Sequence, residues 1–135
     1  MGLKNTTVRQ LTDEDMLEIS EWFANRRWSQ PPRRHMLPET GYVAEREGKL
    51  LSVAWLYITN SSIGIVDWVA TSPDAGYRGL ASLVNLMDHI ELVSKDDTQA
   101  WLHFTGNRKL AEYLKKKCRF KIGERDINLG VRSAR

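Results

Sequence analysis

Hydrophobic residues recur in two different patterns at the start of the chain. Residues 6–12 (TTVRQLT) have the composition of a short strand. Thr12 and Asp15 then have the spacing of a capping box, which satisfies free N–H groups at a helix start. Four apolar residues follow at helical spacing: Met16, Ile19, Trp22 and Phe23. The pattern predicts a strand followed by an amphipathic helix.

The middle of the chain predicts three antiparallel strands. Prolines and arginines fill residues 28–38, so we expect a functional loop there that permits only a short helical turn. Residues 41–47 and 50–60 are rich in β-forming side chains and flank a Glu-Gly-Lys turn. Apolar residues occupy both faces of the second run, which predicts that both are covered. The third run spans residues 63–71 and ends at a Ser-Pro pair.

From Gly79 the apolar residues switch to helical spacing for about four turns. A strand is predicted at 99–105, and a strand–helix–strand unit favours a parallel neighbour with a right-handed crossover. Asn107 is expected to cap a last helix, and residues 120–131 are predicted to form one final strand. The predicted fold class is α/β with a mixed, mostly antiparallel sheet and flanking helices, in the order β-α-β-β-β-α-β-α-β.

Composition narrows the class of protein. A length of 135 residues predicts one domain, taken as residues 1–135. Five Trp, four Tyr and three Phe are enough for a core and exclude a largely disordered chain. No apolar stretch approaches the roughly 18 residues of a membrane span, and the N-terminus lacks a signal-peptide pattern. With Cys118 as the lone cysteine, we expect a cytoplasmic protein without a membrane segment, disulfide or metal centre.

The net charge is +3, which does not by itself indicate a nucleic-acid partner. The charge is unevenly distributed, because four arginines and a histidine gather within residues 26–35, and three lysines and an arginine within 115–119. Each patch is either a solvated face or a binding surface for an acidic group.

Residues 72–82 (SPDAGYRGLAS) join a predicted strand end directly to the long helix. The first N–H groups of a helix lack internal partners and carry the positive end of its dipole, so they bind phosphate where no side chain blocks them. Gly79, Ala81 and Ser82 are small, while Arg78 adds charge and Ser82 a hydroxyl donor. The segment has neither a Walker loop nor a dinucleotide fingerprint. Local residues alone leave two interpretations, a phosphate cradle or an ordinary strand-to-helix turn.

In this segment the chain resembles the GNAT acyltransferases, whose CoA-binding signature is [Gln/Arg]-x-x-Gly-x-[Gly/Ala] after a strand. Gly79 and Ala81 match the last two slots, Gly76 stands in the first, and Arg78 offers charge from a neighbouring position. The predicted order of elements over residues 6–131 is similar to that of the family, whose small stand-alone members also occur in tailed phages. The segment from Asn107 onward is similar to the family's Asn…Tyr-x-x-x-Gly-Phe ending.

The resemblance implies a GNAT-like fold with splayed strands and acetyl-CoA as the co-substrate. The pyrophosphate would lie on the helix start, and the pantetheine would pair with an exposed strand edge as an added pseudo-strand. A backbone N–H near Val69 would stabilise the oxyanion of a tetrahedral intermediate. The implied CoA-binding residues are Val69, Ala70, Thr71, Gly76, Tyr77, Arg78, Gly79, Leu80, Ala81, Ser82 and Asn107.

The candidate catalytic residues are Asp67 and Tyr113. Asp67 interrupts an apolar strand where many similar enzymes carry a glutamate. It is either a base that assists deprotonation of the amine or a hydrogen-bonded side chain of the core. Alternation places it on one face with Val69. The family's general acid is a tyrosine five residues before the Phe, a place held here by Lys115, so Tyr113 is expected to be rotated about 200° away around the helix. His103 is either a second candidate base or a structural histidine.

The acceptor is expected to contact the loop at residues 28–38. The residues assigned to it are Trp28, Arg33, Arg34 and His35, which suit an acidic or phosphate-bearing acceptor and also suit stacking on nucleic-acid bases. The leading interpretation is an acyl-CoA-dependent N-acyltransferase acting on an amine of a small molecule or a protein. A GNAT-shaped binding module that has lost its acid and a nucleic-acid-associated member are the alternatives. By analogy, residues 127–131 are candidates for pairing with a second copy in a homodimer.

Overall fold

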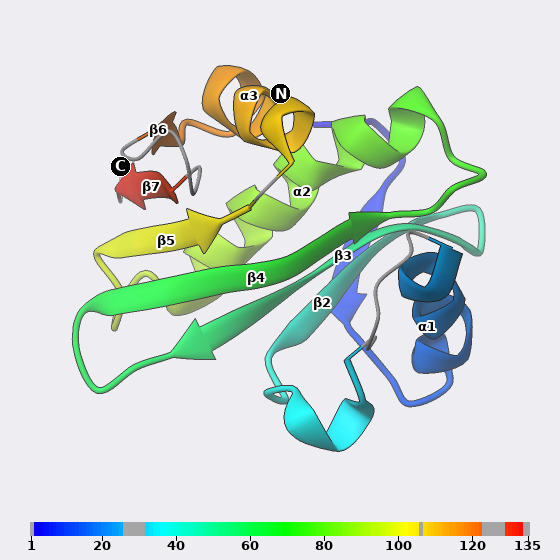
Figure 1. Cartoon of the computed structure of the whole chain (residues 1–135), viewed down its shortest axis with the longest axis horizontal. Coiled ribbons are helices and arrows are strands. Elements are labelled where there is room, and N and C mark those ends of the chain that lie inside the picture. The colour runs from blue at the N-terminus through cyan, green and yellow to red at the C-terminus, as the bar shows by residue number, and fades with distance from the viewer. Residues whose placement is uncertain (1, 26–31, 106, 123–128, 134–135) are drawn as a thin grey trace.

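The computed structural model describes residues 2–25, 32–105, 107–122 and 129–133. Within these ranges seven strands form one mixed sheet in the order β1-β2-β3-β4-β5-β7-β6 (Figure 1). The strands are β1 (Thr7–Gln10), β2 (Gly41–Arg46), β3 (Lys49–Ile58), β4 (Ile63–Thr71), β5 (Ala100–Phe104), β6 (Lys121–Ile122) and β7 (Leu129–Ser133). The helices are α1 (Asp15–Asn25), α2 (Tyr77–Ser94) and α3 (Arg108–Lys117), with a short 3-10 helix, η1, at Arg34–Met36.

The sheet confirms the predicted class and its mostly antiparallel pairing. β4 and β5 are parallel neighbours connected through α2, and the other neighbouring strands are antiparallel. The prediction of one final strand is wrong, because β6 and β7 form a pair. β7 lies between β5 and β6, and its residues Gly130 and Val131 pair with both neighbours. Pairing of this segment with a second copy stays a prediction. Residues 127 and 128 lie outside the described ranges.

The helix α1 begins at the predicted capping box. The Thr12 N–H donates to the Asp15 carboxylate at 2.8 Å, and the Asp15 N–H donates to the Thr12 hydroxyl at 3.3 Å. Arg9 of β1 donates two further hydrogen bonds to Asp15, and these hold the pKa of that carboxyl below its usual range. The start of α1 is therefore tied to the first strand.

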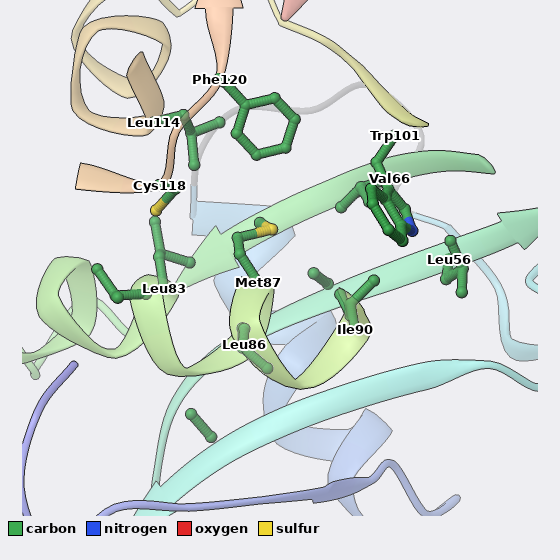
Figure 2. Packing of buried hydrophobic residues seen from close by; sticks show 13 residues of the cluster. Leu56, Val66, Leu83, Leu86, Met87, Ile90, Trp101, Leu114, Cys118 and Phe120 are labelled. Carbon is green, nitrogen blue, oxygen red and sulfur yellow. The ribbon is translucent and has the colours of Figure 1, made fainter. Parts of the chain in front are cut away.

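Hydrophobic clusters cover both faces of the sheet, as the apolar pattern of β3 predicts. On one face α2 and α3 pack against the sheet through residues such as Leu56, Met87 and Leu114 (Figure 2). On the other face α1 packs through Phe23 against Trp55 of β3. β3 is consequently buried on both sides and fixes the two helical layers relative to each other.

The strand β4 contains a β-bulge that the sequence pattern does not show. Asp67 pairs with Trp55 and Ala70 pairs with Val53, so two steps along β3 stand opposite three steps along β4. Trp68 takes the extra position with a left-handed φ of 55°. Its N–H donates to the Asp67 carboxylate at 2.8 Å. The carboxylate therefore satisfies a donor that the irregular ladder displaces.

The bulge changes which side chains share a face. Alternation would place Asp67 and Val69 together, but this prediction is wrong. Val69 packs with Val66 in the cluster beneath α2, whereas Trp68 packs with the cluster beneath α1. Asp67 stands opposite Trp55, which belongs to the cluster beneath α1, so Asp67 and Val69 lie on opposite sides of the sheet.

Charged side chains fasten the C-terminal strand to α2. Arg132 of β7 is 2% exposed and donates to Asp88 at 2.9 Å and to Glu91 at 3.3 Å. Arg119 also pairs with Glu91. These contacts hold β7 beside the polar side of α2. Within the described ranges, no helix combines the length and the apolar character that a membrane span requires.

The thiol of Cys118 provides a chemical test of this packing. The side chain is 2% exposed, and burial raises the pKa of the thiol from 9.0 to about 12. Because the thiolate is the reactive form, we expect a thiol reagent at pH 8 to label the native protein roughly a thousandfold more slowly than the urea-unfolded protein. Labelling is followed by absorbance, and equal rates in the two states would contradict the packing of the end of α3.

Candidate functional site

The parallel strands β4 and β5 stay paired for only part of their length. Their ladder runs from Ile63 and Ala100 to Val66 and His103 and ends there, while β4 continues to Thr71. Figure 1 shows the two strands diverging toward the start of α2 and α3. A cleft of about 750 Å³ lies at this divergence. Its lining residues are Phe23, Val69, Ala70, Thr71, Ser72, Pro73, Gly76, Leu80, Thr105, Asn107, Lys109, Leu110 and Tyr113.

The cleft brings together seven of the residues predicted from the sequence. Six of the predicted CoA-binding residues line it: Val69, Ala70, Thr71, Gly76, Leu80 and Asn107. The predicted catalytic residue Tyr113 lines it as well. They come from β4, from the start of α2 and from the start and middle of α3, so three separate segments of chain converge on one hollow.

The start of α2 has the backbone geometry of an anion site. Gly76 is the residue before the helix and has a φ of 56°, which favours glycine. Gly79 packs closely on the sheet, since a Cβ there would lie 3.0 Å from the Thr71 Cβ and 3.3 Å from the Leu51 carbonyl oxygen. Arg78 is exposed in the same turn. Gly76 and Leu80 of this turn line the cleft and Arg78 does not. The N–H groups of Arg78 and Gly79 donate to the carbonyl oxygens of Ala75 and Gly76 at 3.2 and 3.1 Å.

Four further residues of the predicted phosphate loop do not line the cleft. Gly79 and Ala81 are buried, and Tyr77 is 72% exposed and outside the lining. Ser82 is fully buried, and its hydroxyl bonds with the Ser52 hydroxyl and donates to the Gly79 carbonyl. The expectation that Ser82 offers a hydroxyl to an anion is therefore wrong, because that hydroxyl is buried and already hydrogen-bonded within the protein.

The structure also corrects the prediction for Tyr113. Tyr113 faces the cleft, whereas Lys115 is exposed beside a separate hollow. Burial raises the pKa of Tyr113 to about 12, with smaller contributions from Cys118 and from Tyr77. The phenol therefore stays protonated at neutral pH and is a hydrogen-bond donor.

The end of α3 contains one of the residues by which the chain departs from the motif. Arg119, which stands where the motif has glycine, adopts a left-handed φ of 63°. The Phe120 N–H then donates to the Leu114 carbonyl at 3.2 Å and closes the helix end.

Several lining residues were missed by the sequence analysis. Lys109 adds positive charge to the cleft, and its place just after the predicted cap Asn107 is a signal that could have found it. Asn107 caps α3 as predicted, by accepting a hydrogen bond from the Leu110 N–H at 3.2 Å. Phe23 comes from α1, and only the packing of that helix across β4 brings it here.

A second pocket, of about 950 Å³, lies on the α1 side of the sheet. Arg33 and Arg34 line it, as the acceptor assignment predicts. His35 is exposed and does not belong to the lining, and Trp28 lies outside the described residues. Its described lining residues are Met16, Leu17, Ser20, Pro32, Arg33, Arg34, Met36, Leu37, Tyr57 and Trp68.

The two pockets meet at the bulge of β4. Trp68 lines the second pocket and the next residue, Val69, lines the cleft. Phe23 of the cleft packs edge-on against the Trp68 ring with centroids 5.9 Å apart. Adjacent residues of one strand, and one pair of contacting aromatic side chains, therefore line the two hollows.

The candidate bases are not brought into either pocket. Asp67 is half-buried and accepts the Trp68 N–H, but it lines neither hollow. His103 is buried with its Nδ1 3.1 Å from the Val66 carbonyl oxygen, and it packs edge-on against Phe120. Burial lowers the pKa of His103, although the Val66 hydrogen bond and Asp67 oppose this shift. Both side chains stabilise the junction of β4 and β5.

The fold of this chain is similar to that of solved protein structures. No protein-family model and no curated protein sequence matches the chain. A GNAT-family acetyltransferase from Staphylococcus aureus Mu50 superposes with a TM-score of 0.73 at 12% identity, covering 96% of this chain and 99% of that one. This chain has the GNAT fold.

Two further solved structures that are similar to this chain carry acetyl-CoA or coenzyme A. One from Elizabethkingia anophelis, with acetyl-CoA bound, matches with a TM-score of 0.65 at 16% identity and covers 97% of this chain and 99% of that one. N-acetylglutamate synthase from Neisseria gonorrhoeae, complexed with coenzyme A and L-arginine, matches with a TM-score of 0.70 at 17% identity. That match covers 96% of this chain, which spans 33% of the synthase.

The exposed Arg78 allows the anion site of this GNAT fold to be tested without disturbing its packing. A side chain at Gly79 would push α2 away from β4, so charge reversal at Arg78 is the better change. We expect Arg78→Glu to weaken acetyl-CoA binding by about tenfold or more, because a carboxylate replaces a cation beside the pyrophosphate. Calorimetry measures the affinity. Lys95→Glu at the far end of α2 is the control, and an equal effect of both variants would contradict the site.

Proposed function

We propose that this protein is an acyl-CoA-dependent N-acyltransferase that uses acetyl-CoA. The observation that carries the proposal is the meeting of two pockets at one bulged strand. Transfer between two substrates requires their reacting atoms to approach within about 3–3.5 Å, and a pair of pockets opening on the two sides of Trp68 and Val69 suits that requirement. The acetyl group is favoured because a neighbour of the same fold holds acetyl-CoA.

The cleft suits the extended shape of CoA. The pyrophosphate is assigned to the start of α2, between Gly76 and Leu80, with Arg78 and Lys109 as cations. The amide groups of the pantetheine are assigned to the edge of β4 from Val69 to Thr71, where the partner strand β5 has diverged. This arrangement directs the thioester toward the bulge.

The bulge supplies the electrostatic part of the proposed reaction. The N–H of Trp68 is engaged by Asp67, so the donor that we assign to the acyl oxygen is the N–H of Val69. A fixed donor aimed at this oxygen stabilises the negative charge that develops as the amine attacks. Asp67 thereby acts as a positioning residue, because it holds the irregular backbone from which the donor projects.

The proton balance assigns one step to Tyr113. The amine nitrogen forms a bond to the acyl carbon, the carbon–sulfur bond breaks, and the leaving thiolate takes a proton from the Tyr113 phenol, which regains a proton from water before the next turnover. No Asp or Glu belongs to the described lining of either pocket, so the amine proton passes to solvent water. A thiol has a pKa near 8.5, so its departure needs less help than that of an alkoxide.

Activity of the parent protein and of Tyr113→Phe tests the proposal. The parent is expected to bind acetyl-CoA and to release free CoA when amines are added. Loss of a positioned acid usually costs about 10²-fold or more, so Tyr113→Phe is expected to lower kcat on that scale and leave acetyl-CoA affinity nearly unchanged. A thiol-detecting assay measures CoA release.

The matched control is Tyr42→Phe, a half-buried tyrosine that packs on His89 and lines neither pocket. Its kcat is expected to equal that of the parent. A parent that binds acetyl-CoA but transfers nothing to any amine would favour a GNAT-shaped binding module. Full activity of Tyr113→Phe would remove the acid from the mechanism.

The role of Asp67 is tested by a nearly isosteric change. Asp67→Asn keeps an oxygen that accepts the Trp68 N–H but removes a base. If Asp67 only positions the bulge, kcat changes by less than about threefold. A loss of about 10²-fold or more at unchanged stability would instead restore Asp67 as the general base that the sequence indicated.

A further inference from the structure

The lining of the second pocket is rich in hydrogen-bond donors and contains no described carboxylate. Arg33 and Arg34 provide cations, and Ser20 and Tyr57 provide hydroxyl groups. We propose that the acceptor is an amine that carries one anionic group and an apolar body, with Arg33 and Tyr57 binding the anion. This inference rests on the proposed function and names the substrate class of its second site.

The two arginines differ in how much charge they offer. Arg34 forms an ion pair with Asp13, with the Arg34 Nε 2.9 Å from a carboxylate oxygen. Arg33 is exposed and forms no ion pair with any described acidic residue. Arg33 therefore carries the uncompensated charge, and a guanidinium matches the geometry of a carboxylate or a phosphate.

Tyr57 is held as a donor by its neighbour across the strands. The indole Nε1–H of Trp68 donates to the Tyr57 hydroxyl oxygen at 2.9 Å. This bond occupies an acceptor position of the phenol and leaves its O–H to donate to another group. Because Tyr57 and Trp68 both line the pocket, that proton is directed toward an acceptor-rich ligand rather than toward a cation.

The remaining walls are apolar. Met16, Leu37 and the face of Trp68 line the interior, and Leu17 and Met36 are exposed apolar side chains of the same pocket. A volume of about 950 Å³ is near the upper end of small-molecule sites, which run about 300–1,000 Å³. A polyamine would place its positive charges against the arginines, which is unfavourable. A small polar anion would leave the apolar walls exposed to water. An apolar amino acid or its phosphonate analogue satisfies both surfaces.

A matched set of amines tests the inference on the full chain. The set is L-phenylalanine, its phosphonate analogue, L-phenylalaninamide and spermidine. We expect kcat/KM for phenylalanine or its phosphonate to exceed that for the amide by about tenfold or more. The amide has the more readily deprotonated amine, which works against this result. The two anionic analogues distinguish a carboxylate from a phosphate-like ligand.

Variants connect the preference to the named side chains. Arg33→Gln is expected to raise KM for the anionic amine about tenfold, while kcat and the KM of the amide stay nearly unchanged. Tyr57→Phe should act in the same direction, and Arg34→Gln less strongly than Arg33→Gln. Lys95→Gln removes the same charge at the far end of α2 and should match the parent. An Arg33→Gln enzyme that keeps its preference for the anion would overturn the inference.

Calorimetry of phenylalanine binding separates this inference from the proposed function. Binding that depends on Arg33 supports the pocket even in a protein that does not turn over acetyl-CoA. Acetyl transfer that prefers spermidine or the amide contradicts the pocket assignment and leaves the transferase assignment intact.

Discussion

The β-bulge at Asp67–Val69 is the constraint on which the two pockets depend. A bulky residue with a left-handed φ costs on the order of 1–3 kcal/mol and persists only where its surroundings fix it. Trp68 is fixed in three ways, by the Asp67 carboxylate on its N–H, by the Tyr57 hydroxyl on its indole, and by edge-on packing on Phe23. The contacts come from β4, β3 and α1, so three elements together fix the strained backbone.

The consequences of the bulge extend to both pockets. It turns Trp68 toward the α1 side and Val69 toward the cleft, so one short segment of backbone serves both pockets. The divergence of β4 from β5 beyond Val66 then exposes the strand edge that leads to the start of α2.

The sequence predicts the architecture well because its elements have strong periodic signals. The capping box at Thr12, the parallel unit formed by β4, α2 and β5, and the Asn107 cap all form as expected. The irregular features escape prediction, because their backbone is set by packing. The bulge residue is Trp68 and the end of α3 is Arg119, and neither is the glycine that normally marks a left-handed position.

These irregular positions decide the candidate site. The unseen bulge hid the separation of Asp67 from Val69, and the unseen helix end hid the position of Tyr113 in the cleft. Tyr57 could not be assigned from sequence, because its role depends on a hydrogen bond from Trp68 on the neighbouring strand. Side chains that act through tertiary contacts require the fold before their chemistry can be inferred.

A crystal structure with a bisubstrate analogue, in which the sulfur of CoA is joined through an acyl linker to the amine of phenylalanine, tests the central claim most directly. The account predicts the pyrophosphate at the start of α2, the linker carbonyl at about 2.9 Å from the Val69 N–H, and the phenyl ring beyond Trp68 in the pocket of Arg33. An analogue with both arms on one side of the bulge, or with its linker away from β4, would contradict it.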